Sequence, residues 1–497
     1  MISATPSLAE EGGGGGEIAR QFQGTACSSP CNLTPPDMGG SVGPSQVVQM
    51  LNGSFTVYSR QGAVLPSPMT GTGTDSSFWL STNPTDQTLA TIVGTGLSDP
   101  RVIYDPSSKR WFASEISVGG GTGTSVNQIL VAVSRDSNPL NGFSSVHFNS
   151  SPNTFGDFPT LGVNQDSVVI GTNNFPSNGG GEGLGTAIGT SIFSLPKSDL
   201  TAGPPTAANM TSFVDSPLTL PPRLGLTPEP ATNFGSNNAT VLRVISGFGT
   251  VRIASSQITG GGSANANLIP LGITPMTPGG QPQDGRQPGA LGMPALPIDA
   301  GDNRISSGPF QVGNKIYFAQ SILKGPDDVI QWGIMDATTG AITAQGLISL
   351  PNEDLLYPAI AANADGNFMI GFNGSGPSTN ISDYFDLCST IGMSVSCAAP
   401  QLDFSSLYPN YNLPDRTDPD HANRWGDYSW VSVDPLDPLH FWLFQEYPTS
   451  SNSWGTLISD VFVPEPASLL PMVTGLAGLG LLRRRRRHLG AAAVRSG

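Results

Sequence analysis

The chain of 497 residues carries 37 acidic and 22 basic side chains, which gives a formal net charge of −15. Six of the arginines follow Leu482, so the rest of the chain is more acidic still, and such a surface argues against binding to nucleic acid or to an anionic membrane. The chain has 62 Gly and 44 Pro, only 12% charged residues and no long helical periodicity before its tail. This composition predicts an all-β protein of short strands joined by many turns.

The N-terminal segment, residues 1–35, contains a run of glycines at 12–16 and is predicted to be disordered. Residues 47–59 follow as strand, turn and strand, with the hairpin dipeptide Asn52-Gly53 between the strands. Residues 39–43 (GGSVG) match the G-x-S-x-G pattern of serine hydrolases. Because the stretch follows two prolines and leads into a strand, we interpret it as a glycine-rich turn.

A short motif recurs through residues 36–463. Each copy has an apolar strand after its anchor, an Asp or Asn five residues on, then a turn and a second apolar strand, and in every copy but that of Pro309 an Asp or an aromatic residue lies close before the anchor. The anchors are Pro100, Pro159, Pro309, Pro358 and Ser429. With the hairpin 47–59 and a weaker copy at 240–253, they make seven units of about sixty residues, a period typical of β-propeller blades.

The sequence therefore predicts an all-β propeller with seven blades over residues 36–463. Six blades are the alternative if the N-terminal hairpin closes the ring with the last strands near 456–463, and an array of two-sheet sandwiches also suits short alternating strands. Residues 260–302, rich in Gly, Pro, Gln and Ala, are predicted to be a long loop.

Four cysteines fall in two close pairs, Cys27 with Cys31 and Cys388 with Cys397. In an oxidising compartment this spacing predicts two local disulfides. A zinc site is the alternative, but it requires two distant pairs to meet, and neither pair has the CxxC spacing of a zinc knuckle.

Sialidase-type glycosidases are also propellers, and they use an arginine cluster with a Tyr–Glu nucleophile pair. If this chain is an enzyme of that type, the candidate catalytic residues are Arg101, Arg304 and Arg424, near the starts of predicted inner strands, and the adjacent Glu446 and Tyr447. The structural alternative is that the arginines pair with acidic side chains and backbone carbonyls between blades.

Residues 415–427 form the densest polar cluster in the chain. Their carboxylates suit the oxygen ligands of Ca²⁺, although the spacing is not that of an EF-hand and a solvated loop explains the cluster equally well. The possible calcium ligands are Asp415, Asp418, Asp420 and Asp427. The sequence requires no cofactor beyond this possible calcium.

The starts of the inner strands gather around the central channel of a propeller, so a binding surface is predicted there. Its candidate residues are Asp99, Asp157, Arg424, Trp425, Asp427 and Tyr428. In a binding protein, Trp425 and Tyr428 with Trp430 are expected to form an exposed aromatic strip.

The tail begins with an apolar, uncharged stretch, residues 467–482, and five arginines follow it. As a helix this stretch spans roughly 24 Å, slightly less than a hydrocarbon core of about 30 Å, and snorkelling arginines with local thinning absorb the difference. The arginines belong on the cytoplasmic side, which places the remainder outside. A buried C-terminal helix is the alternative.

Val-Pro-Glu-Pro, the apolar helix and the arginine cluster together resemble the PEP-CTERM sorting signal of Gram-negative bacteria that make exopolysaccharide. The matching residues are Pro464, Glu465 and Pro466 as motif, 467–482 as helix, and Arg483, Arg484, Arg485, Arg486 and Arg487 as stop. The resemblance covers residues 464–497. It implies that the tail anchors an exported protein in the inner membrane until an exosortase cuts near the motif. Because the first twenty residues lack the basic and apolar regions of an export signal, the true start is expected upstream of Met1.

Residues 424–429 (RWGDYS) also resemble a motif of uncharacterised secreted bacterial propeller-like proteins, which carry no known activity. The sequence thus predicts an exported, exosortase-processed protein of the cell surface or extracellular matrix that binds or structures exopolysaccharide and is not expected to be an enzyme. The alternatives are a sialidase-like glycan hydrolase or lyase, and a protein-binding propeller in a surface assembly.

Overall fold

The structure is a computed structural model of the chain. It describes residues 15–27, 34–66, 73–119, 126–151, 154–176, 187–215, 226–247, 249–289, 295–392, 394–413 and 422–464. No helix within these ranges has the length and apolarity needed to cross a membrane. The predicted membrane helix, 467–482, lies outside the described residues.

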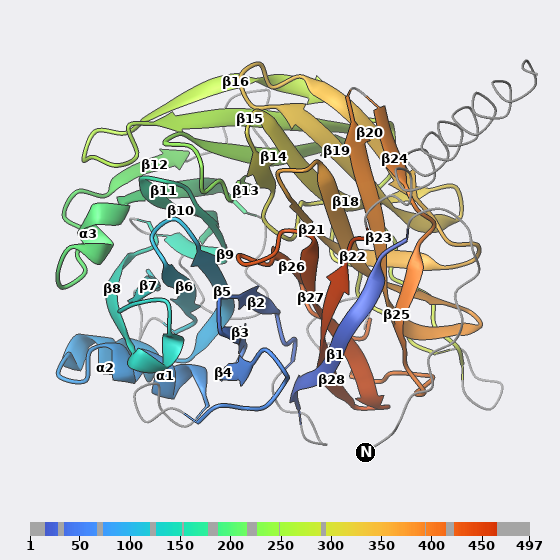
Figure 1. Cartoon of the computed structure of the whole chain (residues 1–497), viewed down its shortest axis with the longest axis horizontal. Helices are drawn as coiled ribbons and strands as arrows, with labels where there is room; N and C mark the ends of the chain where they lie inside the picture. Colours follow the sequence, from blue (N-terminus) through green and yellow to red (C-terminus); the bar gives the residue numbers. More distant parts are fainter. Residues whose placement is uncertain are drawn as a thin grey trace, which may run out of the picture.

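The described strands form seven antiparallel sheets around a common centre, which confirms the prediction of a seven-bladed propeller (Figure 1). Blade 1 consists of β2 (Gly39–Val42), β3 (Gln46–Leu51) and β4 (Ser54–Ser59). Blades 2 to 4 consist of β5 (Leu97–Asp105), β6 (Arg110–Ser117), β7 (Gln128–Ser134) and β8 (Phe143–Asn149); β9 (Thr154–Val163), β10 (Ser167–Pro176), β11 (Gly189–Pro196) and β12 (Thr211–Asp215); and β13 (Leu226–Pro230), β14 (Ala239–Gly247), β15 (Thr250–Thr259) and β16 (Asn267–Pro275).

Blade 5 consists of β17 (Phe310–Val312), β18 (Lys315–Lys324), β19 (Asp327–Asp336) and β20 (Ile342–Ile348). Blade 6 consists of β21 (Asp354–Ala362), β22 (Asn367–Gly376), β23 (Thr379–Ile391) and β24 (Ser394–Cys397), and β25 (Gln401–Ser405) also pairs with β23. Blade 7 consists of β26 (Trp430–Val433), β27 (His440–Ser450), β28 (Ser453–Phe462) and β1 (Glu17–Ala26).

The first strand of each blade lies nearest the centre (Figure 1). These inner strands contact one another in sequence from β2 through β5, β9 and β13, and from β17 through β21 and β26 back to β2. A parallel bridge between Thr232 and Phe310 joins blades 4 and 5. The inner strands therefore enclose a central channel, and every one of them starts at the same end of it.

Two short helices accompany the three-stranded blade 1. α1 (Asp75–Thr82) and α2 (Gln87–Val93) contact each other, and α1 also contacts β4 and β8. Phe78 of α1 stacks on Phe55 of β4 at 4.1 Å between ring centroids. The helices thus cover the apolar edge that a fourth strand covers in the other blades. A third helix, α3 (Lys197–Thr201), and a 3₁₀ turn at Pro139–Asn141 complete the helical segments of the described chain.

The ring is closed by β1, which pairs antiparallel with β28 from Glu17 opposite Phe462 onward. The prediction that residues 1–35 are disordered is therefore wrong for Glu17–Ala26. Phe22 anchors this strand, because its ring lies 5.6 Å from Tyr58 and 6.4 Å from Trp442. The six-blade alternative is also wrong, since the hairpin 47–59 belongs to blade 1. The predicted loop 260–302 likewise contains a strand, β16.

A bend at the start of the inner strand recurs in several blades and explains the sequence motif. The residue before a proline has a positive φ, between 49° and 61°, at Asp99, Phe158, Thr227 and Tyr357. In all four blades the pairing with the second strand shifts register at this point. Such bulges cost backbone strain and re-aim side chains, here toward the channel.

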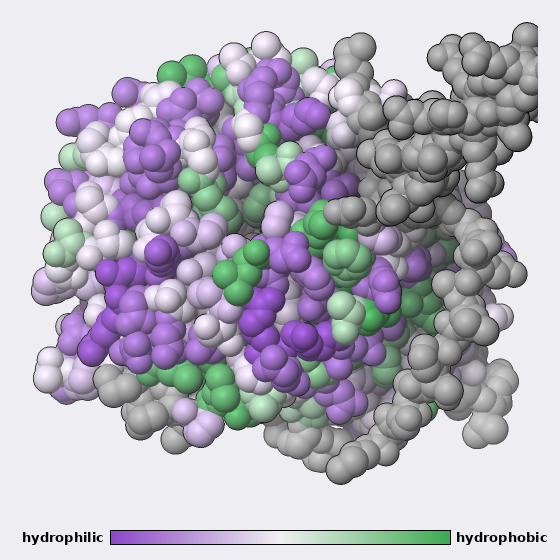
Figure 2. All heavy atoms as spheres, in the orientation of Figure 1, coloured by the Kyte–Doolittle hydropathy of each residue, from purple (hydrophilic) through white to green (hydrophobic). Residues whose placement is uncertain are grey.

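A disulfide joins Cys388 and Cys397 across the adjacent strands β23 and β24, as predicted. The other predicted pair includes Cys31, which lies outside the described residues. The face of the molecule in Figure 2 is mainly hydrophilic, with small, separated hydrophobic patches.

Candidate functional site

Charged side chains converge at the end of the channel where the inner strands start. We call this set the charged mouth; it comprises Asp37, Asp99, Asp157, Asp299, Asp302, Arg304, Arg424 and Asp427. They come from the starts of blades 1, 2 and 3 and from the segments that lead into β17 and β26. A small cavity at this end is lined in part by Phe158, Arg304, Tyr357 and Asp427.

The two arginines of the charged mouth are held in ion pairs. Arg424 Nη1 lies 2.6 Å from Asp427 Oδ1 and 3.1 Å from Asp299 Oδ2. Arg304 donates from Nε and Nη2 to the two oxygens of Asp302, at 2.7 and 2.8 Å, and lies 4.5 Å from the centre of the Phe158 ring. This pairing follows the structural alternative that the sequence suggested, and it leaves acidic side chains in excess.

Three carboxylates of the charged mouth, Asp37, Asp99 and Asp157, form no ion pair within the described part of the chain. Burial, followed by the nearby Asp99 and Asp427, raises the pKa of Asp157 to about 7. Burial and Asp427 also raise the pKa of Asp99. Since Asp157 is only half-buried, a ligand at the channel opening can reach a carboxyl group that titrates near neutrality.

Asp37 connects two blades to the charged mouth. Its Oδ1 accepts from the backbone N–H of Asp427 at 2.8 Å, and its Oδ2 accepts from Asn52 Nδ2 at 2.8 Å. Asn52 Oδ1 in turn accepts from the backbone N–H of Asp99 at 2.9 Å. Sequence reasoning placed neither residue in the site, because Asn52 has the pattern of a hairpin turn and Asp37 follows two prolines.

Two fully buried groups lie further along the channel, Arg101 and Glu229. The Arg101 guanidinium carbon is 3.4 Å from the centre of the Tyr428 ring, and Nη1 donates to the carbonyl of Ser306 at 3.1 Å. Arg101 Nε and Nη2 and both oxygens of Glu229 have no hydrogen-bond partner among the described residues. Burial raises the pKa of Glu229 to about 8, although Arg101 and Arg304 oppose the shift.

No family model matches this chain. No curated protein matches it either. Solved structures with a similar arrangement include a Trypanosoma rangeli sialidase in complex with 2,3-difluorosialic acid, at 9% identity over 85% of this chain and 59% of the sialidase, with a TM-score of 0.37. A protein of unknown function from Dyadobacter fermentans matches at 8% identity over 73% of this chain and 94% of its own, with a TM-score of 0.38.

An exo-β-1,3-galactanase from Phanerochaete chrysosporium matches at 8% identity over 89% of this chain and 99% of its own, with a TM-score of 0.31. This chain spans less than two thirds of the length of the sialidase. At these TM-scores the likenesses carry no function to this chain, and the propeller fold rests on the strand order itself.

The structure does not form the sialidase arrangement considered from the sequence. Glu446 and Tyr447 are successive residues of β27, so their side chains point to opposite faces. Glu446 is buried and accepts from the backbone N–H of Gly426 at 2.9 Å, while the Tyr447 ring lies 4.7 Å from Phe404. Arg101 is covered by Tyr428 and has no access to a ligand at the opening.

The expected exposed aromatic strip is also wrong, because Trp425, Tyr428 and Trp430 are all buried. Trp425 Nε1 donates to Asn373 Oδ1 at 3.1 Å, and the Tyr428 hydroxyl donates to the carbonyl of Pro100 at 2.9 Å. The rings of Trp425 and Tyr428 therefore pack inside the propeller, next to the charged mouth. The sequence pattern alone does not show that both sides of such a segment are buried.

Three of the predicted calcium ligands, Asp415, Asp418 and Asp420, lie outside the described residues. Asp427, the fourth, is paired with Arg424. Within the described ranges, the one group with three potential ligand atoms close together is Asp386 with Cys388 and Cys397. Both of those sulfurs are in the disulfide, so this group does not suit a metal ion. Calcium stays a prediction from the sequence.

Proposed function

We propose that the charged mouth binds a glycan, and that the chain is the propeller ectodomain of an exported surface protein. The observation that carries this proposal is the convergence of half-exposed Asp157, Asp427 and Arg424 on one channel opening, with Asp37 and Asp99 just behind them. Carboxylates and guanidinium groups held in fixed positions are strong partners for sugar hydroxyls. The rigid strand starts of several blades hold them in place.

The charge of the mouth favours an uncharged glycan. Both arginines at the opening already pair with carboxylates, and Asp37, Asp99 and Asp157 add unpaired acidic groups. A polymer of uronic acids would find both arginines already occupied by carboxylates, so its own carboxylates would lose hydration without gaining a cation unless divalent cations bridge it. A neutral polymer instead offers hydroxyl donors, which carboxylates accept.

Export is supported by two features of the chain. The Pro464–Pro466 motif, the apolar stretch and the arginines resemble a sorting signal, and we propose that an exosortase and the inner membrane are its partners. The Cys388–Cys397 disulfide is typical of an oxidising compartment. Binding to exopolysaccharide at the cell surface is the role that combines these features with the charged mouth.

Hydrolysis of the bound glycan is the second candidate, and Asp157 is the observation that favours it. With a pKa of about 7, the Asp157 carboxyl is partly protonated at neutral pH, as a general acid must be. Asp427, which lies 2.6 Å from Arg424, is the second carboxylate at this opening. Glycoside hydrolases use such a pair of carboxylates in different protonation states.

The first test is a titration of the purified full chain with neutral and uronic oligosaccharides by calorimetry. Asp157→Ala is expected to weaken binding of a neutral oligosaccharide about tenfold, equal to about 1.4 kcal/mol. The matched control is Asp365→Ala, an exposed carboxylate in the turn between β21 and β22. Equal affinity of both variants, or tighter binding of the uronic oligomer without divalent cations, would contradict the proposal.

Light scattering on the polymer separates the two candidates. A binder leaves the polymer mass unchanged, whereas a hydrolase lowers it with time. If the mass falls, Asp157→Asn is expected to abolish turnover and keep binding, because the amide retains the shape and loses the proton. Turnover that persists in this variant would exclude Asp157 as the acid.

A further inference from the structure

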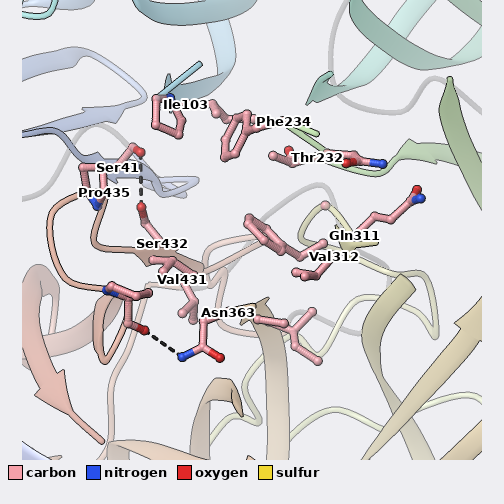
Figure 3. A pocket seen from close by; sticks show the side chains of 18 of the residues that line it. Ser41, Ile103, Thr232, Phe234, Gln311, Val312, Asn363, Val431, Ser432 and Pro435 are labelled. Atoms are coloured by element: carbon pink, nitrogen blue, oxygen red, sulfur yellow. Dashed lines mark hydrogen bonds between the residues drawn. The ribbon is translucent and has the colours of Figure 1, made fainter. Parts of the chain in front are cut away.

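The opposite end of the channel holds a second, chemically different cavity of about 320 Å³. Its wall comes from the far ends of the inner strands and the turns after them, in blades 1, 2, 4, 5, 6 and 7. Figure 3 shows Ile103, Phe234 and Val431 around one space. Prominent in the wall are Ile103, Phe234, Phe310, Val312, Trp430 and Val431. The volume is far larger than the share of one water molecule, about 30 Å³, and reaches the lower range of small-molecule sites.

The wall carries almost no charge. Among its described residues the one charged side chain is Asp434, whose carboxylate forms an ion pair with Arg60 and accepts from Trp442 Nε1 at 3.1 Å. The hydroxyls of Ser41 and Ser432 lie 3.3 Å apart in a shared hydrogen bond (Figure 3). A charged ligand would lose its hydration here without gaining a partner.

Asn233 closes the wall at the end of blade 4. Its backbone N–H donates to the carbonyl of Val163 at 2.9 Å, and its Oδ1 accepts from the backbone N–H of Gly235 at 3.2 Å. Asn233 Nδ2 is buried and has no partner within the described residues, so it faces protein and not the cavity.

We propose that this cavity binds an uncharged, mainly apolar small molecule with a flat aromatic body. The rings of Phe234 and Phe310, 6.1 Å apart and nearly perpendicular, favour such a body. This site is separate from the charged mouth and does not rest on the proposed glycan function.

The test uses the purified full chain and the uncharged fluorescent probe N-phenyl-1-naphthylamine. Saturable fluorescence enhancement is expected, and Val312→Trp is expected to weaken it at least about tenfold by filling the cavity. Pro435→Trp, from another part of the wall, provides a second filling variant if the first does not fold. The matched control is Val214→Trp, because Val214 is 46% exposed on β12 and is expected to have no effect.

The selectivity for uncharged ligands is tested by displacing the probe with 2-acetonaphthone and with 2-naphthoate, which has a similar shape and a negative charge. The wild-type chain is expected to bind the uncharged ketone at least about tenfold more tightly than the carboxylate. Absence of saturation, or equal loss in Val312→Trp and Val214→Trp, would overturn the site. Equal or tighter binding of the carboxylate would overturn the assignment to uncharged ligands.

Discussion

The two ends of the central channel are built from the same seven inner strands, yet they differ in chemistry. At the strand starts, carboxylates and arginines gather where bulges turn the backbone, whereas at the strand ends Ile103, Phe234 and Val431 surround an apolar cavity. Arg101 and Tyr428 lie between the two ends. One strand can thus present different side chains at its two ends. The bulge at its start changes the direction of the side chains there, whereas the rest of the strand keeps the regular alternation.

The largest effect on the free energy of unfolding is expected from replacing Arg101, which lies between the two ends of the channel. Arg101→Met is expected to destabilise the chain by about 2–4 kcal/mol, because it removes the hydrogen bond to the Ser306 carbonyl and the guanidinium contact with the Tyr428 ring. Urea unfolding measures the loss, with a substitution of the exposed Arg252 of β15, Arg252→Met, as control, expected to change stability by about 0.5 kcal/mol or less. Equal losses of stability in both variants would show that buried Arg101 contributes no more to stability than an exposed arginine.

The next largest effect is expected from Glu229, whose titration makes the stability of the chain depend on pH. Its pKa is raised from 4.5 to about 8, so between these values the folded chain keeps a proton that the unfolded chain has lost. The stability it contributes is present at low pH and is lost as pH rises toward 8. Glu229→Gln should flatten this decline and be more stable than wild type above pH 8 by about 1–3 kcal/mol. Parallel stability–pH curves for the two chains would contradict the buried position of Glu229.

At the charged end, binding of a neutral glycan is expected to follow the titration of Asp157. Because ionised carboxylates accept hydrogen bonds more strongly, affinity should rise severalfold from pH 6 to pH 8 in the wild-type chain. Asp157→Asn has no carboxyl group to titrate at this position and should show a weaker pH dependence by calorimetry, with the remainder due to Asp37 and Asp99. If hydrolysis occurs instead, its rate should fall over the same interval, since the acid loses its proton.

The smallest effect is expected when the apolar end is changed and the charged end is measured. Val312→Trp should alter glycan affinity by no more than about 0.5 kcal/mol, because sites without shared partners behave additively. Competition calorimetry with the same oligosaccharide checks this. A larger change would mean that the two ends are coupled through the inner strands.

The propeller was predictable because its strongest signal is local. A proline after a residue with positive φ recurs at the starts of inner strands, and the anchors at Pro100, Pro159 and Pro358 reveal blade after blade. The closing strand β1 was not predictable, since its polar sequence contributes little beyond Phe22 to the core. β16 is similarly exposed, because an outer strand buries little apolar surface and so carries a weak pattern.

For the site, the sequence identified Asp99, Asp157 and Asp427 as neighbours because strand starts must meet around a channel. It could not identify Glu229, which lies between two prolines and becomes part of the channel only through the bulge at Thr227. It also could not show that Tyr428 is buried, because that depends on the neighbouring blades.

If the two channel ends are independent sites, a change at one end leaves binding at the other end intact, and calorimetry measures this directly. Asp157→Ala and Val312→Trp are each titrated with a neutral oligosaccharide and with 2-acetonaphthone. Asp157→Ala is expected to lose about tenfold in glycan affinity alone, and Val312→Trp about tenfold in ketone affinity alone. Loss of both ligands in either variant, or of neither ligand in both, would contradict the independence of the two sites.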